Sequence, residues 1–91
     1  MTDTRETQRL DKWLWHARFF RTRTLAADMV SRGKVRVNAR LVKKPSAAVG
    51  QGDTLTIVQG AHVRIVRVEG FAARRGSAPQ AQSLYSNLDQ D

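Results

Sequence analysis

The chain has 91 residues, enough for one small domain with a single modest core. It contains no cysteine, which excludes disulfide bonds and thiolate metal sites. Lysine and arginine outnumber aspartate and glutamate by 16 to 8, and the resulting net charge of +8 suits a polyanionic partner better than a positively charged one.

The first eight residues are polar and include Asp3 and Glu6. We expect residues 1–8 to be a disordered N-terminus without a signal peptide. No apolar stretch approaches the roughly 20 residues that span a bilayer, so no membrane contact is expected. The expected location is the cytoplasm.

Residues 9–20 are predicted to form a first helix. Apolar side chains recur there at spacings of three and four, which places one stripe against the core: Leu10, Trp13, Leu14, Ala17 and Phe20. Trp15 and Phe19 lie on the opposite side. They either pack against the C-terminal segment, the interpretation we favour, or form an exposed aromatic platform.

A second helix is predicted to begin after Thr22, whose hydroxyl suits an N-cap, and to end near Arg32 with Gly33 just beyond it. Its inner side is expected to carry Leu25, Ala26, Met29 and Val30. Two short helices joined by residues 21–23 predict a helix-turn-helix.

The period then changes to two, which is typical of strands. Val35 and Val37 alternate with basic residues, and Asn38-Ala39 supplies a turn before Leu41, so a hairpin is predicted. Residues 54–58 alternate again, with Leu55 and Ile57 on one face. Residues 62–68 are rich in β-formers without clean alternation, which predicts a strand buried on both faces or carrying a bulge.

Composition changes from Gly70 onward, and residues 73–79 are predicted to be a connector. Pro79 is expected to begin a short helix that continues through Leu84, Tyr85 and Leu88, followed by a frayed end. The predicted class is α+β: two N-terminal helices in a helix-turn-helix, packed on a small, mostly antiparallel β-sheet, with a short C-terminal helix or tail.

Residues with catalytic or metal-binding potential do not form a recognisable site. His16 and His62 lie on different elements without a carboxylate at ligand spacing, so no metal site is expected. Residues 50–52 read Gly-Gln-Gly, which lacks the further glycine and the following helix of a dinucleotide loop. We therefore expect no enzyme activity and no cofactor.

A binding surface is expected in the first half of the chain, because eleven of the sixteen basic residues and only two acidic ones lie between Arg9 and Lys44. The basic residues come from the first helix, the turn after it, and the hairpin with its exit. If the hairpin packs beside the helices, these groups line one concave, L-shaped surface suited to folded RNA. The candidate RNA-binding residues are Arg9, Lys12, Arg18, Arg21, Thr22, Arg23, Lys34, Arg36, Lys43 and Lys44.

Four segments resemble the alpha-L RNA-binding motif of ribosomal protein S4: residues 9–23, residues 33–38, Lys44-Pro45-Ser46, and Gly52-Asp53. A more specific similarity, to the bacterial heat-shock protein 15 family, lies in Leu10-Asp11-Lys12-Trp13-Leu14-Trp15, in Arg74-Arg75, and in Ala78, Ala81 and Leu84-Tyr85. The resemblance covers residues 9 to about 85. It divides the chain into an S4-like RNA-binding domain at 9–70 and a C-terminal extension at 71–91.

The resemblance implies a heat-shock protein that binds ribosomal RNA of free large subunits that carry a stalled nascent chain on transfer RNA. Such a protein helps to recycle these subunits. It further implies contacts with transfer RNA and with single- or double-stranded DNA, and we expect a monomer. Position by position, it places RNA contacts at Arg9, Lys12, Arg21, Thr22, Arg23, Lys34, Lys43 and Lys44.

Two departures from the family pattern are visible. The family usually continues into a longer, basic C-terminal helix, whereas this sequence ends in Asn87-Leu88-Asp89-Gln90-Asp91, which predicts a weaker or differently arranged ribosome contact. Ala39 follows Asn38 where the motif often has glycine, which leaves the turn type open.

Three alternatives remain at this point. A related alpha-L module could serve another RNA, such as transfer RNA. A DNA-binding protein could place the second helix in a major groove, although no symmetric dimer interface is evident. A protein-interaction module could dock through Trp15 and Phe19.

Overall fold

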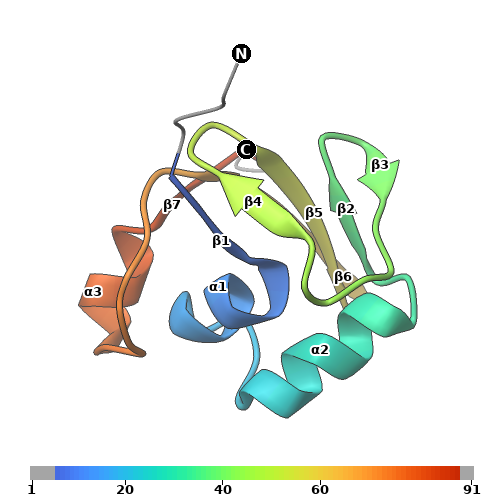
Figure 1. Ribbon diagram of the computed structural model, residues 1–91, viewed down its shortest axis with the longest axis horizontal. Helices are drawn as coiled ribbons and strands as arrows, with labels where there is room; N and C mark the ends of the chain where they lie inside the picture. Colours follow the sequence, from blue (N-terminus) through green and yellow to red (C-terminus); the bar gives the residue numbers. More distant parts are fainter. Residues whose placement is uncertain (1–5, 89–91) are drawn as a thin grey trace.

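The structure, a computed structural model, describes residues 6–88 and confirms the α+β class (Figure 1). Its elements follow in the order β1 (Thr7–Arg9), α1 (Leu10–His16), α2 (Arg23–Ser31), β2 (Val35–Val37), β3 (Arg40–Leu41), β4 (Ala48–Gly50), β5 (Thr54–Gln59), β6 (His62–Val68), α3 (Ala78–Gln82) and β7 (Tyr85–Asn87). Within residues 6–88, none of the helices is long and apolar enough to cross a membrane.

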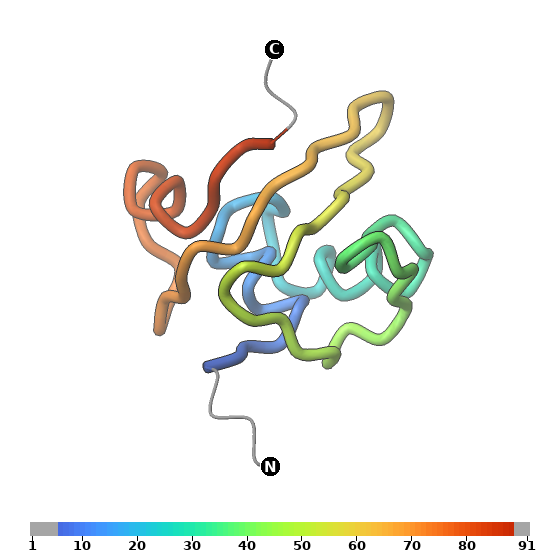
Figure 2. Tube along the Cα trace, turned by 90° about the horizontal axis from the view of Figure 1, so that it is seen from above, coloured from blue at the N-terminus to red at the C-terminus, as the bar shows by residue number. Residues whose placement is uncertain are grey.

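A five-stranded antiparallel sheet in the order β3-β2-β5-β6-β7 forms one layer, and β1 pairs with β4 in a separate two-stranded sheet. Helices α1 and α2 lie against one face of the larger sheet (Figures 1 and 2). The boundary predicted between residues 8 and 9 falls inside β1, so the expected disordered N-terminus does not extend to Thr7 and Gln8. Residues 1–5 lie outside the described part of the chain.

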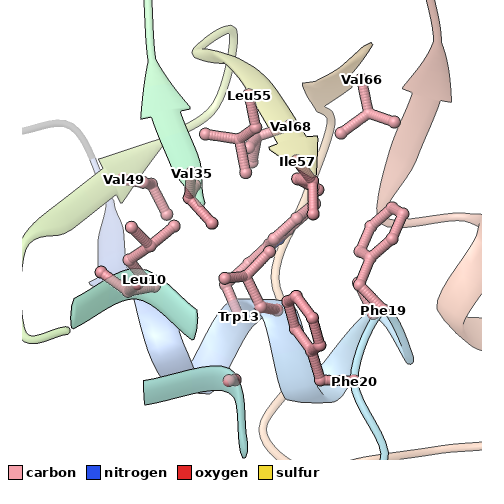
Figure 3. Packing of buried hydrophobic residues seen from close by; sticks show 14 of the residues in the cluster. Leu10, Trp13, Phe19, Phe20, Val35, Val49, Leu55, Ile57, Val66 and Val68 are labelled. Carbon is pink, nitrogen blue, oxygen red and sulfur yellow. The ribbon is translucent and has the colours of Figure 1, made fainter. Parts of the chain in front are cut away.

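The core lies between α1 and the sheet, with Trp13 near its centre (Figure 3). The predicted stripe is buried as expected, from Leu10 to Phe20. Phe19 joins this core, since its ring centroid lies 5.9 Å from Trp13 and 4.7 Å from Tyr85. The favoured packing against the C-terminal segment is thus confirmed for Phe19, whereas Trp15 is half-buried beside His16.

Helix α1 ends at His16, four residues earlier than predicted. Arg18 takes a left-handed conformation, with φ of 66°. Its N–H donates to Trp15 O (3.0 Å) and the N–H of Phe19 donates to Leu14 O (3.0 Å), which together make a Schellman motif. The expected helix over 9–20 is therefore wrong beyond His16, because a non-glycine residue terminates it.

The predicted ends of α2 are confirmed. Thr22 Oγ1 accepts a hydrogen bond from Leu25 N (3.0 Å), and Gly33 follows the helix with φ of 78°. Ala26 and Val30 face the core, and Met29 is partly buried. The prediction for Leu25 was wrong, since 41% of this residue is exposed.

The predicted hairpin is present as β2 and β3. Val37 pairs with Arg40, so the loop consists of Asn38 and Ala39, both with positive φ (52° and 69°). This is the type I′ pattern that matches the twist of a two-residue hairpin, and alanine occupies its second position. Asn38 Oδ1 also accepts a hydrogen bond from Thr54 N (2.9 Å), which ties the turn to β5.

Two strand predictions need correction. β6 pairs residue for residue with β5, without the expected bulge, and only its last part is buried, at Val66 and Val68. The chain after α3 does not continue as a helix: Tyr85–Asn87 form β7 at the edge of the sheet. The backbone turns at Leu84, whose carbonyl accepts hydrogen bonds from Glu69 N (2.8 Å) and Gly70 N (3.2 Å).

Candidate nucleic-acid interface

The first turn of α1 is tied to the loop that follows β3. Leu10 N donates to Ala47 O (2.8 Å) and Asp11 N donates to Pro45 O (3.1 Å), so this loop satisfies N–H groups that a helix start leaves free. Lys44, which is exposed, immediately precedes Pro45. The exit of the hairpin and the beginning of α1 are thereby held side by side.

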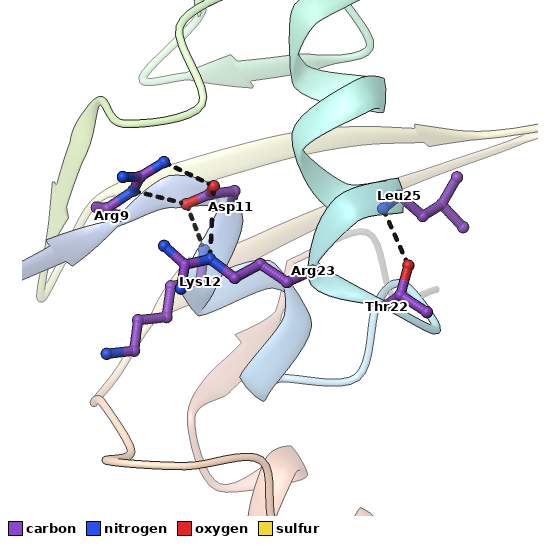
Figure 4. Close-up of polar contacts among 6 residues, drawn as sticks. All are labelled: Arg9, Asp11, Lys12, Thr22, Arg23 and Leu25. Carbon is purple, nitrogen blue, oxygen red and sulfur yellow. Dashed lines mark hydrogen bonds and ion pairs between the residues drawn. The ribbon is translucent and has the colours of Figure 1, made fainter.

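A buried carboxylate organises the basic residues at this end of α1 (Figure 4). Asp11 Oδ1 and Oδ2 accept hydrogen bonds from Arg9 Nε (3.1 Å) and Arg9 Nη2 (2.9 Å). Asp11 Oδ1 also accepts from Lys12 N (2.7 Å), and Arg23 Nε lies 3.7 Å from Asp11 Oδ2. One acid therefore draws together arginines from β1 and from the first turn of α2.

We call Arg9, Lys12 and Arg23 the α1–α2 basic cluster. The Asp11 side chain is only 3% exposed, whereas those of Arg9 and Arg23 are 50% and 42% exposed. A guanidinium has five N–H donors, so both arginines keep donors that can reach outward. This arrangement suits a phosphate oxygen, which accepts hydrogen bonds from planar guanidinium groups.

The turn between the helices contributes further predicted residues. Arg21 is exposed at the edge of a shallow groove of about 440 Å³ that is also lined by Phe20, Leu25 and Met29. Thr22 is exposed, but its hydroxyl oxygen already caps α2. Arg21 and Thr22 therefore lie directly before Arg23 at the start of α2.

The hairpin residues lie at different places. Lys34 and Lys43 are exposed. Lys43 lies close to Gly33, just after the end of α2, since a Cβ atom added to Gly33 would be 3.4 Å from Lys43 Cε. Arg36 pairs with Leu41 and Thr56, on the face of β2 opposite the buried Val35. The structure thus places Lys44 in the loop that contacts the start of α1, and Arg36 on another face of the sheet.

Arg18 also lies away from the cluster. Its Nη1 donates to Gly76 O (2.9 Å), in the connector before α3. It borders a groove with Arg64 and Gln82 rather than the start of α2. The single L-shaped surface predicted from the sequence is accordingly reduced in the structure, because Arg18 and Arg36 do not share the face of Arg9 and Arg23.

The C-terminal half of α1 binds residues 70–77, which precede α3 and which we call the connector from here on. Trp13 Nε1 donates to Gly70 O (2.9 Å), His16 Nδ1 lies 3.0 Å from Ala72 O, and Arg75 Nε donates to Trp15 O (3.1 Å). Burial lowers the pKa of His16, and the charges of Lys12 and Arg23 lower it further. The hydrogen bond to Ala72 O raises this pKa and offsets part of the change. The neutral imidazole can donate from Nδ1 to that carbonyl.

Sequence reasoning missed Asp11 as part of the site. The available signal was an acidic residue at the first turn of a helix within a strongly basic stretch, where a carboxylate is favoured by the helix N-terminus. Among residues 6–88 there is no group of three or more histidine, aspartate or glutamate side chains placed to hold a metal ion.

Comparison with known proteins identifies the family. The S4 domain model matches residues 8–55, more than half of the chain. The chain belongs to the S4-domain family. This match runs from β1 into β5 and includes every predicted RNA-contact residue, whereas the connector held by α1 lies outside it.

Individual relatives show which S4-domain proteins this chain is similar to. It is 45% identical to the heat shock protein 15 homolog of Aeromonas salmonicida over 96% of this chain and 65% of that relative, so it spans less than two thirds of that protein's length. It is 31% identical to the RQC P-site tRNA stabilizing factor of Listeria innocua, over 93% of this chain and 90% of the relative. The resemblance predicted from the Trp-Leu-Trp run is confirmed.

A solved structure supports the same assignment. The trimeric structure of Vibrio cholerae heat shock protein 15 superimposes with a TM-score of 0.86 and 44% identity, and covers 92% of this chain and 84% of that chain. The S4-domain fold is therefore shared with that protein. The trimer belongs to the Vibrio protein, and a monomer remains the prediction for this chain.

Proposed function

We propose that this protein binds structured ribosomal RNA of the large ribosomal subunit without catalysing a reaction. The observation that carries the proposal is the α1–α2 basic cluster, in which a buried Asp11 holds two half-exposed arginines beside Lys12. Arg21, Lys43 and Lys44 are exposed and are proposed as further phosphate contacts. Phosphate contacts of this kind fix the position of an RNA and leave specificity to its shape.

The particle proposed as target is the free large subunit that carries a stalled nascent chain on transfer RNA. Support comes from the similarity to heat shock protein 15 relatives and from the name of the Listeria relative, which refers to P-site transfer RNA. We propose that binding helps to recycle such subunits during heat stress. The cytoplasm is the compartment in which this target occurs.

A second candidate is that the cluster contacts transfer RNA itself, and the name of the Listeria relative favours it. An exposed phosphate-binding surface would also tolerate DNA, because a duplex presents the same charged oxygens. Competition with free transfer RNA and with duplex DNA separates these two partners from ribosomal RNA.

Sedimentation tests the proposal. Purified protein is mixed with small subunits, free large subunits or whole ribosomes, with or without competing free transfer RNA or duplex DNA. Each mixture is centrifuged through a sucrose cushion over a series of salt concentrations. We expect pelleting with free large subunits, lost as salt rises with a slope that corresponds to roughly four to eight phosphate contacts. Equal pelleting with every ribosomal particle would contradict the selectivity.

Paired variants locate the surface. Arg21→Ala with Arg23→Ala should weaken pelleting strongly, whereas Arg67→Ala with Arg74→Ala removes the same charge outside the predicted site and should change it little. Circular dichroism melts establish that both variants are folded. An equal loss in the two variants would mean that net charge, rather than the α1–α2 basic cluster, drives binding.

A further inference from the structure

Asp11 has no evident place on a surface that meets a polyanion, since a carboxylate repels phosphate. Only two acidic residues, Asp11 and Asp28, lie between Arg9 and Lys44, and they differ in burial. The Asp28 side chain is 48% exposed and pairs with Arg32 (2.9 Å) along one side of α2. The Asp11 side chain is 3% exposed and lies beneath Arg9 and Arg23.

The contacts of Asp11 explain how a buried carboxylate is tolerated. Burial of a charge is costly unless partners satisfy it, and Asp11 receives two hydrogen bonds from Arg9, one from Lys12 N, and the nearby charge of Arg23. In turn, two hydrogen bonds hold the Arg9 side chain, and the ion pair draws Arg23 toward the same carboxylate. A side chain that is already ordered loses less entropy when it binds a ligand.

We propose that Asp11 is a positioning residue for RNA binding: it fixes Arg9 and Arg23 so that their outward N–H groups receive one stretch of RNA backbone. This inference rests on the proposed function and adds that a buried carboxylate orders the arginine side chains before RNA binds. The phosphate oxygens would lie on the solvent side of the guanidinium groups, with Asp11 on the buried side.

For a substitution of Asp11, the proposal predicts a change in RNA affinity that is opposite in sign to the change predicted from net charge alone. Asp11→Asn raises the net charge by one, so charge alone predicts tighter RNA binding. Loss of positioning predicts weaker binding, by about tenfold, because both arginines must then be ordered by the RNA. Asp28→Asn is the matched control, since it raises the net charge equally and leaves Arg9 and Arg23 in place.

The experiment measures fluorescence anisotropy of a labelled stem-loop RNA from large-subunit ribosomal RNA with wild type, Asp11→Asn and Asp28→Asn. We expect Asp28→Asn to bind as wild type or slightly more tightly, and Asp11→Asn to bind more weakly. NMR of the Arg9 Nε–H should show a sharp, protected signal in wild type that is lost in Asp11→Asn. Asp11→Asn binding as tightly as Asp28→Asn would overturn the inference.

A second variant keeps the inference testable if Asp11→Asn does not fold. Arg9→Lys keeps the charge of an exposed side chain but cannot form the paired contact with Asp11. We expect a lower melting temperature, because the buried carboxylate loses a hydrogen bond, and weaker RNA binding by the folded variant. Wild-type affinity in folded Arg9→Lys would overturn the positioning role. Failure of the wild-type protein itself to bind RNA would instead contradict the proposed function.

Discussion

The two ends of α1 differ in what their side chains contact. At the N-terminal end, Arg9 and Lys12 project charge toward solvent around the buried Asp11. At the C-terminal end, Trp13 and His16 direct their ring N–H groups to backbone carbonyls of the connector, more than fifty residues away in the chain. A helix of seven residues thus serves an interface at one end and tertiary structure at the other.

This difference separates binding from stability in a testable way. Substitutions at the connector end should change the free energy of unfolding and leave the RNA affinity of the folded protein unchanged. Substitutions of exposed residues at the charged end should do the reverse. A variant that changes both quantities strongly would break the distinction.

The largest effect is expected for Trp13→Phe. This change removes the hydrogen bond to Gly70 O and leaves a cavity beside Phe19, which should lower the free energy of unfolding by about 2 to 4 kcal/mol. Urea titration measures the loss, and RNA anisotropy on the folded variant should give wild-type affinity. A stability close to wild type would show that the Trp13 contact to the connector contributes little.

A smaller, pH-dependent effect is expected from His16. Because the pKa of buried His16 lies below its ordinary value of 6.5, the unfolded chain takes up a proton before the folded protein does. The stabilisation is fully present above pH 6.5 and is lost as the pH falls through the lowered pKa. His16→Asn, which can still donate to Ala72 O, should remove this dependence.

Urea titrations at a series of pH values below neutrality measure that dependence. The control is His62→Asn, which removes an exposed histidine on β6 and keeps the contact of His16 with Ala72 O. A profile that remains pH-dependent in His16→Asn would assign the titration to another group.

The smallest effect is expected for Arg18→Gly. Glycine relieves a left-handed backbone that costs a non-glycine residue roughly 1 kcal/mol, while loss of the exposed bond to Gly76 O removes a similar amount, so stability should change by about 0.5 kcal/mol or less. Gly33→Ala, in the equivalent position after α2, should instead destabilise by about 1 kcal/mol. Thermal melts compare the two variants.

RNA affinity adds a further test of Arg18. The sequence groups Arg18 with the candidate contacts, whereas the structure places its guanidinium on the connector. An affinity loss in Arg18→Gly as large as that of an Arg23 variant would restore Arg18 to the interface and weaken the distinction between the two ends of α1.

Local signals in the sequence were sufficient where the structure is determined locally. The hydroxyl of Thr22 and the missing side chain of Gly33 define the ends of α2, and the alternation around Val35 defines β2. These features depend on residues within one turn or one strand, so a single sequence predicts them. The burial of the stripe from Leu10 to Phe20 follows from periodicity in the same way.

Long-range contacts account for what the sequence did not predict. The end of α1 at a left-handed Arg18 is accompanied by its bond to Gly76, 58 residues away. Tyr85 leaves the predicted helix because the edge of β6 offers a backbone partner at Val68. Asp11 could not be recognised as an organiser of arginines until α1 and α2 were packed together, since Arg23 lies twelve residues away.

NMR titration of the labelled protein with a large-subunit stem-loop RNA tests most directly whether the α1–α2 basic cluster contacts RNA. The account predicts that the largest amide shifts occur at residues 9–12 and 21–24, with residues 64–67 of β6 unaffected. Largest shifts on β6 or in the connector over residues 70–76 would contradict it.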